Sequence, residues 1–368
     1  MGDEERRYRL WLSFALGTAY VRMQSLLETY DGDGKAIFRD AAAACLPGVG
    51  KRELACNAVL HQKANEAYID DCLAYMTRRK IQAVLVEDEN YPALLRHIYR
   101  PPMVLYLRGR LPKRIPVPIA LIGSRNCSDY GRHMALKLSE ELAERGVCVV
   151  SGLAYGIDCL CARGALAAEK SEFPTIAVLG GGVDVVYPAA NRREYDQIVE
   201  RGAVVSELLP GTKPLPSHFP QRNRIISGIS RGVVVIEAAL QSGTGITVDF
   251  ALEQGKDVFA LPGRLTDPKS AGANRLIAQG MAKAVESTKD ILDAYDMDFE
   301  EIKSGAAVNE NALSFEQTLI LRLLQAGERS ADELAEMTGF SSSQLNFALT
   351  DMEFSGIIKQ SCGRLYSL

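Results

Sequence analysis

The residues best suited to chemistry in this sequence are Arg222, Asn223 and Arg224, which close a loop rich in proline and glycine. Pro220 can occupy the first turn of a helix, because the N–H that proline lacks is not needed there. The three residues would then lie near the N-terminus of that helix, where free N–H groups and the helix dipole favour an anion. Two guanidiniums at such a place favour phosphate. The alternative is a surface loop whose arginines pair with nearby carboxylates.

Small and polar residues recur where apolar, strand-like runs end. These further candidates are Gly123, Ser124, Arg125, Ser151, Gly152, Gly181, Gly182, Asn191, Ser242, Gly243 and Thr244. In open α/β sheets, ligands bind at the carboxyl ends of the strands. Glycines there let a ligand approach backbone N–H groups closely. The pattern therefore predicts one crevice that offers several contacts to phosphate.

Three aromatic residues lie close to these candidates in the sequence: Tyr155, Tyr187 and Phe219. Cations that hold a backbone, together with rings that stack on bases, suit a single strand of nucleic acid. The rings could instead pack in the core or at the rim of the crevice.

The sequence offers little for catalysis. It has neither a dinucleotide fingerprint after the first strand nor a Walker A motif, and its four histidines lie in no nucleophile or metal motif. Asp158, Asp184, Glu207 and Glu237 fall at strand ends, where a carboxylate more often caps a helix or anchors an arginine. We expect no catalytic residue, no metal and no cofactor.

Composition limits the possible partners. The chain has 42 Lys and Arg against 46 Asp and Glu, a net charge of −4, which disfavours coating duplex DNA with an overall basic field. Its eight cysteines lack metal spacing and are expected to be buried or inert thiols in a reducing compartment. No apolar run approaches the ~20 residues of a membrane helix, and the N-terminus does not read as a signal peptide. A cytoplasmic protein without a membrane partner is expected.

A doubly wound, mostly parallel α/β sheet must position these residues. Apolar runs alternate with amphipathic helical stretches from residue 118 onward. The runs cover residues 119–123, 147–152, 175–181, 203–207, 233–238 and 257–263.

Four further segments flank or open this sheet. Residues 1–75 read as a helical, SAM-like domain with a helix-hairpin-helix turn at 46–50, which could offer N–H groups to phosphate or be purely structural. A bridging segment, 76–117, with two β-like runs opens the domain 76–292. An acidic linker (293–312) and a winged-helix domain (313–368) follow. The would-be recognition helix has no lysine or arginine, which favours protein contact or packing over a DNA groove.

These motifs resemble those of the DNA-processing protein A family (DprA, also called Smf). The matching stretches are IGSR (122–125), SGLAYGID (151–158), GGGVDVVYPAANR (180–192), the segment 206–230, SGTGIT (242–247), FALPG (259–263) and GANRLIAQG (272–280). They cover most of the chain in the family's order.

The resemblance implies an extended Rossmann-like domain between a helical N-terminal domain and a winged helix. It implies a homodimeric protein that binds single-stranded DNA, shields it from nucleases and loads RecA recombinase during natural transformation, without catalysing a reaction. By position, Arg125 would bind phosphate, Phe219 would contact a base, and residues 222–224 would form the RNR segment. The sequence departs from the family at Tyr155, where a basic residue is frequent, and at Ala162, where a histidine is frequent.

Two other functions stay open. One is a nucleotide hydrolase resembling the LOG-type phosphoribohydrolases, although residues 241–247 lack that family's PGG and its closely following glutamate, and Glu253 lies too far along. The other is a scaffold with a vestigial crevice, whose function resides in the acidic linker and the winged helix.

Overall fold

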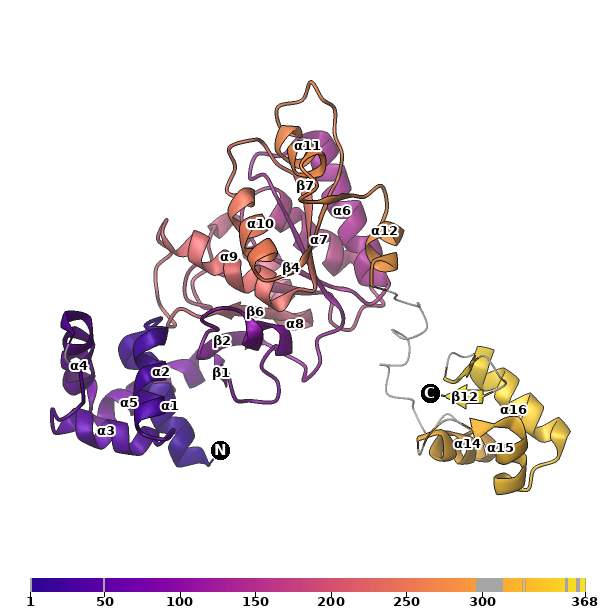
Figure 1. Cartoon of the computed structure of the whole chain (residues 1–368), viewed down its shortest axis with the longest axis horizontal. Helices are drawn as coiled ribbons and strands as arrows, with labels where there is room; N and C mark the ends of the chain where they lie inside the picture. Colours follow the sequence, from indigo (N-terminus) through magenta and orange to yellow (C-terminus); the bar gives the residue numbers. More distant parts are fainter. Residues whose placement is uncertain are drawn as a thin grey trace. The chain divides into compact units, whose positions relative to one another are not determined.

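The computed structural model describes residues 2–48, 50–295, 314–325, 327, 329–354, 357–361 and 365–367. The chain divides into two compact units, Met1–Ile291 and Leu292–Leu368 (Figure 1). The predicted fold class is confirmed, because a mostly parallel sheet follows an N-terminal helical region and a winged helix ends the chain. Residues 296–312 of the predicted acidic linker lie outside the described residues.

Five helices open the larger unit. They are α1 (Asp3–Leu16), α2 (Tyr20–Thr29), α3 (Gly34–Ala42), α4 (Lys51–Lys63) and α5 (Glu66–Arg78). Their apolar faces bury side chains such as Trp11 and Leu26, and the same cluster continues into Val104 and Tyr106 of the sheet. The helices therefore share a core with the sheet, and a separate domain ending at residue 75 stays a prediction.

The helix-hairpin-helix turn is closed by its own acid. The N–H of Gly50 donates to the carboxylate of Glu53 at 3.1 Å, at the start of α4. Arg22 reaches from α2 to donate to the carbonyl of Pro47 in the same turn. Because a carboxylate already occupies the place where an anion would bind, the structure favours the purely structural alternative. Val49, within this turn, lies outside the described residues.

The central sheet has the strand order β1-β2-β6-β5-β4-β3-β7-β8-β9. Its strands are β1 (Gln82–Leu85), β2 (Val104–Gly109), β3 (Pro118–Gly123), β4 (Cys148–Ser151), β5 (Thr175–Val178), β6 (Ala203–Ser206), β7 (Gly232–Glu237), β8 (Asp257–Ala260) and β9 (Lys283–Ala284). All six predicted apolar runs form strands, and neighbours from β6 to β9 pair in parallel. The bridging segment supplies β1 and β2, which extend the sheet antiparallel.

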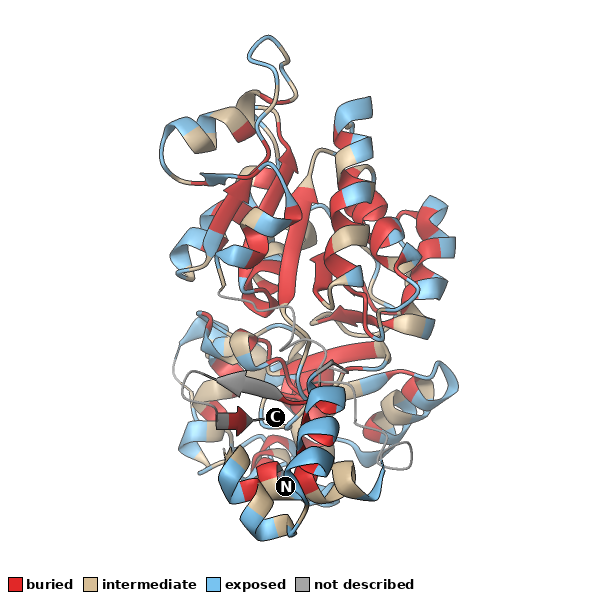
Figure 2. Cartoon of the chain, turned by 90° about the vertical axis from the view of Figure 1, so that its right-hand side faces the viewer, coloured by how far each residue is buried: buried red, intermediate tan, exposed pale blue. Residues whose placement is uncertain are grey.

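Helices cover both faces of this sheet. They are α6 (Asp129–Glu144), α7 (Ile157–Ala167), α8 (Arg192–Arg201), α9 (His218–Ile229), α10 (Thr244–Glu253), α11 (Ala271–Ala278) and α12 (Thr288–Asp293), with short 3-10 turns η1 (Ala93–His97) and η2 (Ala189–Asn191). Strands β4, β5 and β6 follow one another on one side of β3, whereas β7, β8 and β9 follow one another on its other side. Because crossovers between parallel strands are right-handed, this reversal places α6–α8 and α9–α10 on opposite faces of the sheet. Figure 2 shows the strands buried between these helices. The order reverses between β3 and β7, which makes this pair the topological switch point.

The smaller unit has a core of its own. It contains α14 (Phe315–Gln325), α15 (Ala331–Thr338), α16 (Ser342–Phe354) and the strands β10 (Arg329–Ser330), β11 (Lys359–Ser361) and β12 (Leu365–Ser367). The predicted capping box of Ser330 and Glu333 begins α15. The predicted C-terminal hairpin is the antiparallel pair β11–β12.

Candidate nucleic-acid interface

A crevice of about 600 Å³ opens at the switch point, beyond the carboxyl ends of β3 and β7. Nine of the predicted residues line it: Gly123, Ser124, Arg125, Phe219, Arg222, Asn223, Ser242, Gly243 and Thr244. A smaller adjoining pocket shares Arg125 and Phe219 and adds Gly152 and Gly181. The structure therefore brings together segments that are more than one hundred residues apart in the sequence.

Arg125 and Phe219 lie at the mouth shared by the crevice and the smaller pocket. The guanidinium carbon of Arg125 lies 5.4 Å from the centre of the Phe219 ring. Arg125 is exposed and has no ion-pair partner among the described residues. A β-carbon at Gly180 would lie 2.9 Å from the Phe219 ring, so glycine there leaves room for the ring. The contact presents a free cation and an aromatic face side by side.

Two tyrosines complete the aromatic surface. Tyr155 and Tyr187 are 51% and 49% exposed and line the smaller pocket, so they belong to the rim and not to the core. The ring of Tyr187 lies 5.7 Å from that of Phe219 at an angle of 43°. Ala162, the other departure from the family pattern, is fully buried in α7 and packs in a core cluster.

Arg222 is not an open cation, which corrects the expectation of two guanidiniums free for phosphate. Its side chain is only 5% exposed and its Nη1 donates to the carbonyls of Gly152, at 2.7 Å, and Val178. A β-carbon at Gly152 would overlap the guanidinium, so only glycine fits beneath it. Burial lowers the pKa of Arg222 to about 10, while the charge of Asp158 opposes this shift. Arg222 ties the ends of β4 and β5 together under the crevice.

Arg224 follows the alternative prediction, because it pairs with a nearby carboxylate. It forms an ion pair with Glu207 and donates to the carbonyl of Arg100 at 2.8 Å. Two residues along a helix turn a side chain by about 200°, so positions 222 and 224 cannot face the same ligand. Pro220, in contrast, lies in the first turn of α9 as predicted.

The carboxylates at the strand ends anchor the fold, as their positions in the sequence predict. Asp158 accepts from the N–H of Gly152 at 3.1 Å, and burial raises its pKa. Asp184 accepts from the hydroxyl of Tyr75 at 2.6 Å. Glu237 accepts from the N–H of Ser128 at 3.0 Å, at the start of α6.

Three other predicted residues support the turns instead of lining the crevice. Ser151 donates to the carbonyl of Asp158 at 3.3 Å, and Nδ2 of Asn191 donates to the carbonyl of Leu153 at 3.0 Å. Gly182 packs so tightly that a β-carbon would lie 2.7 Å from the backbone nitrogen of Gly211. Each is held by contacts within the fold.

The N-termini of α9 and α10 carry no side-chain cap and border the crevice, so their N–H groups can face an anion. Thr244 and Thr247 lie in the same wall and are more than nine-tenths buried, and their hydroxyls have no hydrogen-bond partner among the described residues. Thr247 and Asn126 also line the crevice, although the sequence motifs did not identify them as candidates. The three-residue spacing of the threonines places both on one helix face and could have identified Thr247.

The cysteines of the described residues are all free thiols, and burial raises the pKa of Cys159 to about 11. Within the described part of the chain, no cluster of His, Cys, Asp or Glu is arranged to hold a metal ion. The same part contains no helix that combines the length and apolarity needed to cross a membrane.

Two family models match the chain. The model of the DNA recombination-mediator protein A covers residues 82–296, and the model of the DprA winged helix domain covers residues 305–364. The DNA processing protein DprA of Streptococcus pneumoniae is 42% identical over 228 residues, which is 62% of this chain and 79% of the relative.

Solved structures give the same result. The X-ray structure of DprA from Streptococcus pneumoniae has a TM-score of 0.65 and 34% identity, covering 78% of this chain and 97% of that one. A structure of DNA processing protein A from Helicobacter pylori, described by its single-stranded DNA binding mode, has a TM-score of 0.52 and 28% identity. That match covers 58% of this chain and 95% of the other.

Proposed function

Because the chain belongs to the DNA recombination-mediator protein A family, we propose that it binds single-stranded DNA in the crevice at the switch point. The single-stranded DNA binding mode described for the Helicobacter pylori relative supports this proposal. The observation that carries it is the contact of Arg125 with Phe219, which offers a cation to phosphate and a ring to a base at one point.

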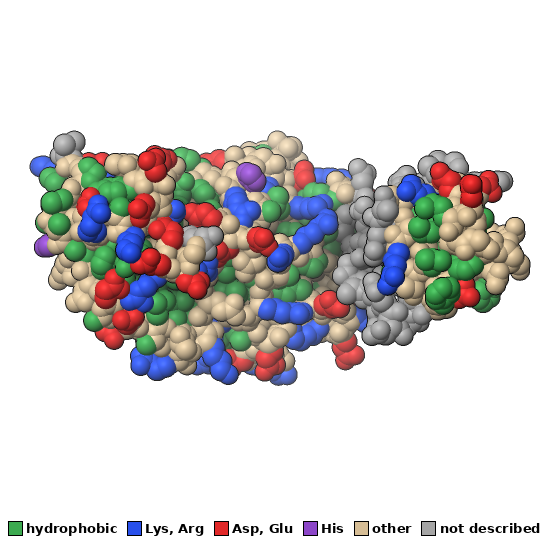
Figure 3. All heavy atoms as spheres, turned by 90° about the horizontal axis from the view of Figure 1, so that it is seen from below, with side chains coloured by type: hydrophobic (Ala, Val, Ile, Leu, Met, Phe, Trp, Pro, Cys, Tyr) green, Lys and Arg blue, Asp and Glu red, His purple; other side chains and the backbone are tan. Residues whose placement is uncertain are grey.

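The crevice suits a strand whose bases are unpaired. Arg125 and the uncapped N-termini of α9 and α10 would hold phosphates, and Phe219 with the two rim tyrosines would stack on bases. These contacts do not read base edges, so binding is expected to be largely independent of sequence. On the face shown in Figure 3, acidic and basic side chains of the larger unit are interspersed, which suits local binding better than coating of a duplex.

We further propose that the bound strand is shielded from nucleases and passed to RecA recombinase by a homodimer in the cytoplasm, with no catalysed reaction. The family's description as a recombination mediator supports this role. The carboxylates at the strand ends that could have served a hydrolase are engaged in structural contacts. Incubation with nucleoside monophosphates and detection of free base would test the hydrolase alternative.

Substitution of Arg125 by alanine tests the proposed site. We expect the affinity for oligonucleotides of different sequence to fall by a similar factor. The negative slope of log K against log salt should become less steep, by about 0.7 for each lost phosphate contact. Fluorescence anisotropy at several salt concentrations measures both quantities. Arg231→Ala is the matched control, because Arg231 is exposed at the opposite, amino end of β7. Unchanged affinity and slope in Arg125→Ala would remove the crevice from the DNA path.

A further inference from the structure

Three consecutive cations, Arg78, Arg79 and Lys80, end α5 in the N-terminal helical region. All three are exposed, and none forms an ion pair with another described residue. One cation at the C-terminus of a helix is explained by the helix dipole. A row of three without acidic partners exceeds that need and leaves an unneutralised positive surface.

Two hydrogen bonds connect this end of α5 with the wall of the smaller pocket. The Tyr75 hydroxyl donates to Asp184 at 2.6 Å, and Asp184 also accepts from the N–H of Gly211 at 2.7 Å. Gly211 belongs to the loop 211–214, whose Pro214 lines the pocket. The loop is therefore a shared wall, with the pocket on one side and Tyr75 on the other.

Arg79 lies against Tyr75, the residue that joins this wall to α5. The guanidinium carbon of Arg79 is 5.4 Å from the centre of the Tyr75 ring. The pKa of Tyr75 is raised chiefly by its hydrogen bond to Asp184, and the charges of Arg79 and Arg78 oppose that rise, so both guanidiniums are near the phenol. Lys213, on the loop itself, is exposed and likewise has no ion-pair partner among the described residues.

We propose that a single strand bound in the crevice continues across the loop 211–214 onto Lys213 and the cations at residues 78–80. This inference rests on the proposed function and deepens it, because it makes the N-terminal helical region a second part of the DNA-binding surface. A polyanion that leaves the smaller pocket beside Pro214 meets unpaired positive charges next, and each phosphate neutralised there releases counterions. The tight packing of Tyr75 against Asp184 fixes the spacing between the two parts.

The test uses the full chain and a ladder of oligothymidylates from about 4 to about 16 nucleotides, the range of site sizes in single-strand-binding folds. We expect wild-type affinity to rise with length. The double variant Arg78→Ala/Arg79→Ala should bind the shortest strands with the affinity of the wild type. It should lack the increase in affinity that the wild type shows on the longest strands. On long strands, its slope of log K against log salt should be less steep by about 1.4, which is two contacts at about 0.7 each.

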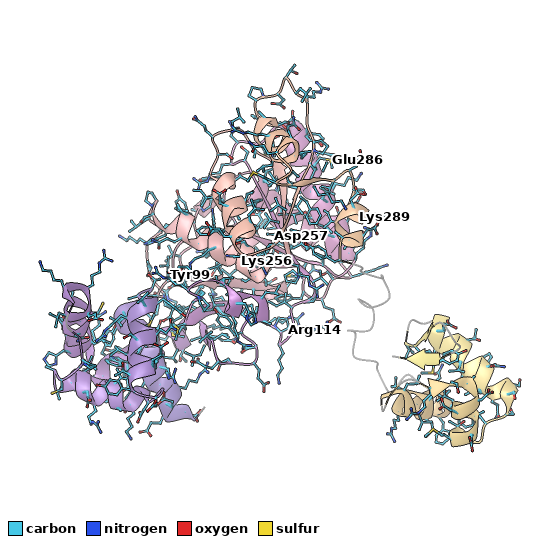
Figure 4. The ribbon with its side chains drawn as sticks, viewed as in Figure 1. Tyr99, Arg114, Lys256, Asp257, Glu286 and Lys289 are labelled. Atoms are coloured by element: carbon cyan, nitrogen blue, oxygen red, sulfur yellow. The ribbon has the colours of Figure 1, made fainter. Side chains whose placement is uncertain are left out.

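Arg114→Ala/Lys289→Ala is the matched control for the loss of two charges. Both residues are exposed, and Figure 4 shows them on the part of the larger unit away from α5. Wild-type affinity of the double variant for short strands shows that it is folded. Wild-type affinity and slope on long strands would overturn this inference alone, whereas failure of the wild type to bind any strand would overturn the proposed function with it.

Discussion

At the scale of single residues, Arg222 is a support beneath the crevice and Arg125 is the cation at its mouth. Arg222 satisfies two buried carbonyls, those of Gly152 and Val178, so its removal leaves buried acceptors without a donor. Loss of DNA binding in a variant of Arg222 would thus follow from damage to the strand ends. Arg125 has no such structural contact and reports on phosphate binding more directly.

The environment of Glu207 predicts a pH-dependent stability. Burial raises the pKa of Glu207 above its ordinary value of 4.5, although Arg224 opposes the shift. A carboxyl with a raised pKa in the folded state contributes stability that is complete below pH 4.5 and is lost as pH rises through the folded pKa. We expect the free energy of unfolding of the wild type, minus that of Glu207→Gln, to decrease as pH rises through this window. Urea unfolding at a series of pH values measures it, and a difference that is constant or increases with pH would contradict the prediction.

The sequence correctly predicted that residues 222–224 lie early in a helix, but it could not show that both guanidiniums are engaged within the fold. The partner of Arg222, Gly152, is 70 residues away, and Glu207 is 17 residues from Arg224. The local sequence pattern predicts the helix and its period. The burial of each arginine side chain depends on which strand ends lie beneath the helix, and the local pattern does not specify this. Spacing alone does predict that Arg222 and Arg224 point to different sides of the helix, because two residues correspond to a rotation of about 200°.

At the scale of elements, the switch point between β3 and β7 explains why the site is assembled where it is. The chain segments that follow these two strands meet there, and α9 lies across them. The six long apolar runs predicted this sheet because each is a buried parallel strand. The two-residue strands β9 and β10 were not predicted, since two residues carry no periodic signal.

The uncapped start of α10 predicts opposite effects on stability and on binding. Gly243 is its N-cap, and a β-carbon there would meet no atom within 4 Å. Gly243→Asp should raise the free energy of unfolding by a few tenths of a kcal/mol, up to about 1 kcal/mol, because Gly243 has helical φ and ψ that aspartate can adopt with less loss of chain entropy, and because a carboxylate there favours the helix dipole. The same carboxylate should repel phosphate and weaken DNA binding. Thermal unfolding and anisotropy titration measure the two effects.

Gly243→Asn separates charge from shape at this position. Asparagine also loses less chain entropy than glycine at this helical position but is neutral, so it should stabilise α10 while it leaves DNA affinity nearly unchanged. Equal affinity of the aspartate and asparagine variants would show that no phosphate approaches the start of α10.

At the scale of the whole molecule, the two compact units differ in their suitability for DNA. The crevice and all of its lining residues belong to the larger unit. In the smaller unit, the helix that would enter a DNA groove, α16, carries Asp351 and Glu353 and no cation. A groove-facing helix of this composition would be repelled by phosphates.

Separate cores allow the units to be tested by truncation. The described core clusters of the larger unit share no residue with the cluster of the smaller one. A chain that ends at Tyr295, beyond α12, keeps every residue of the crevice and should bind single strands with the affinity of the full chain. The fragment 314–368 should show no binding at the same salt concentration. If instead the fragment bound and the truncated chain did not, the crevice would be vestigial and the winged helix would carry the function, because only one of the two units would then hold the phosphate contacts.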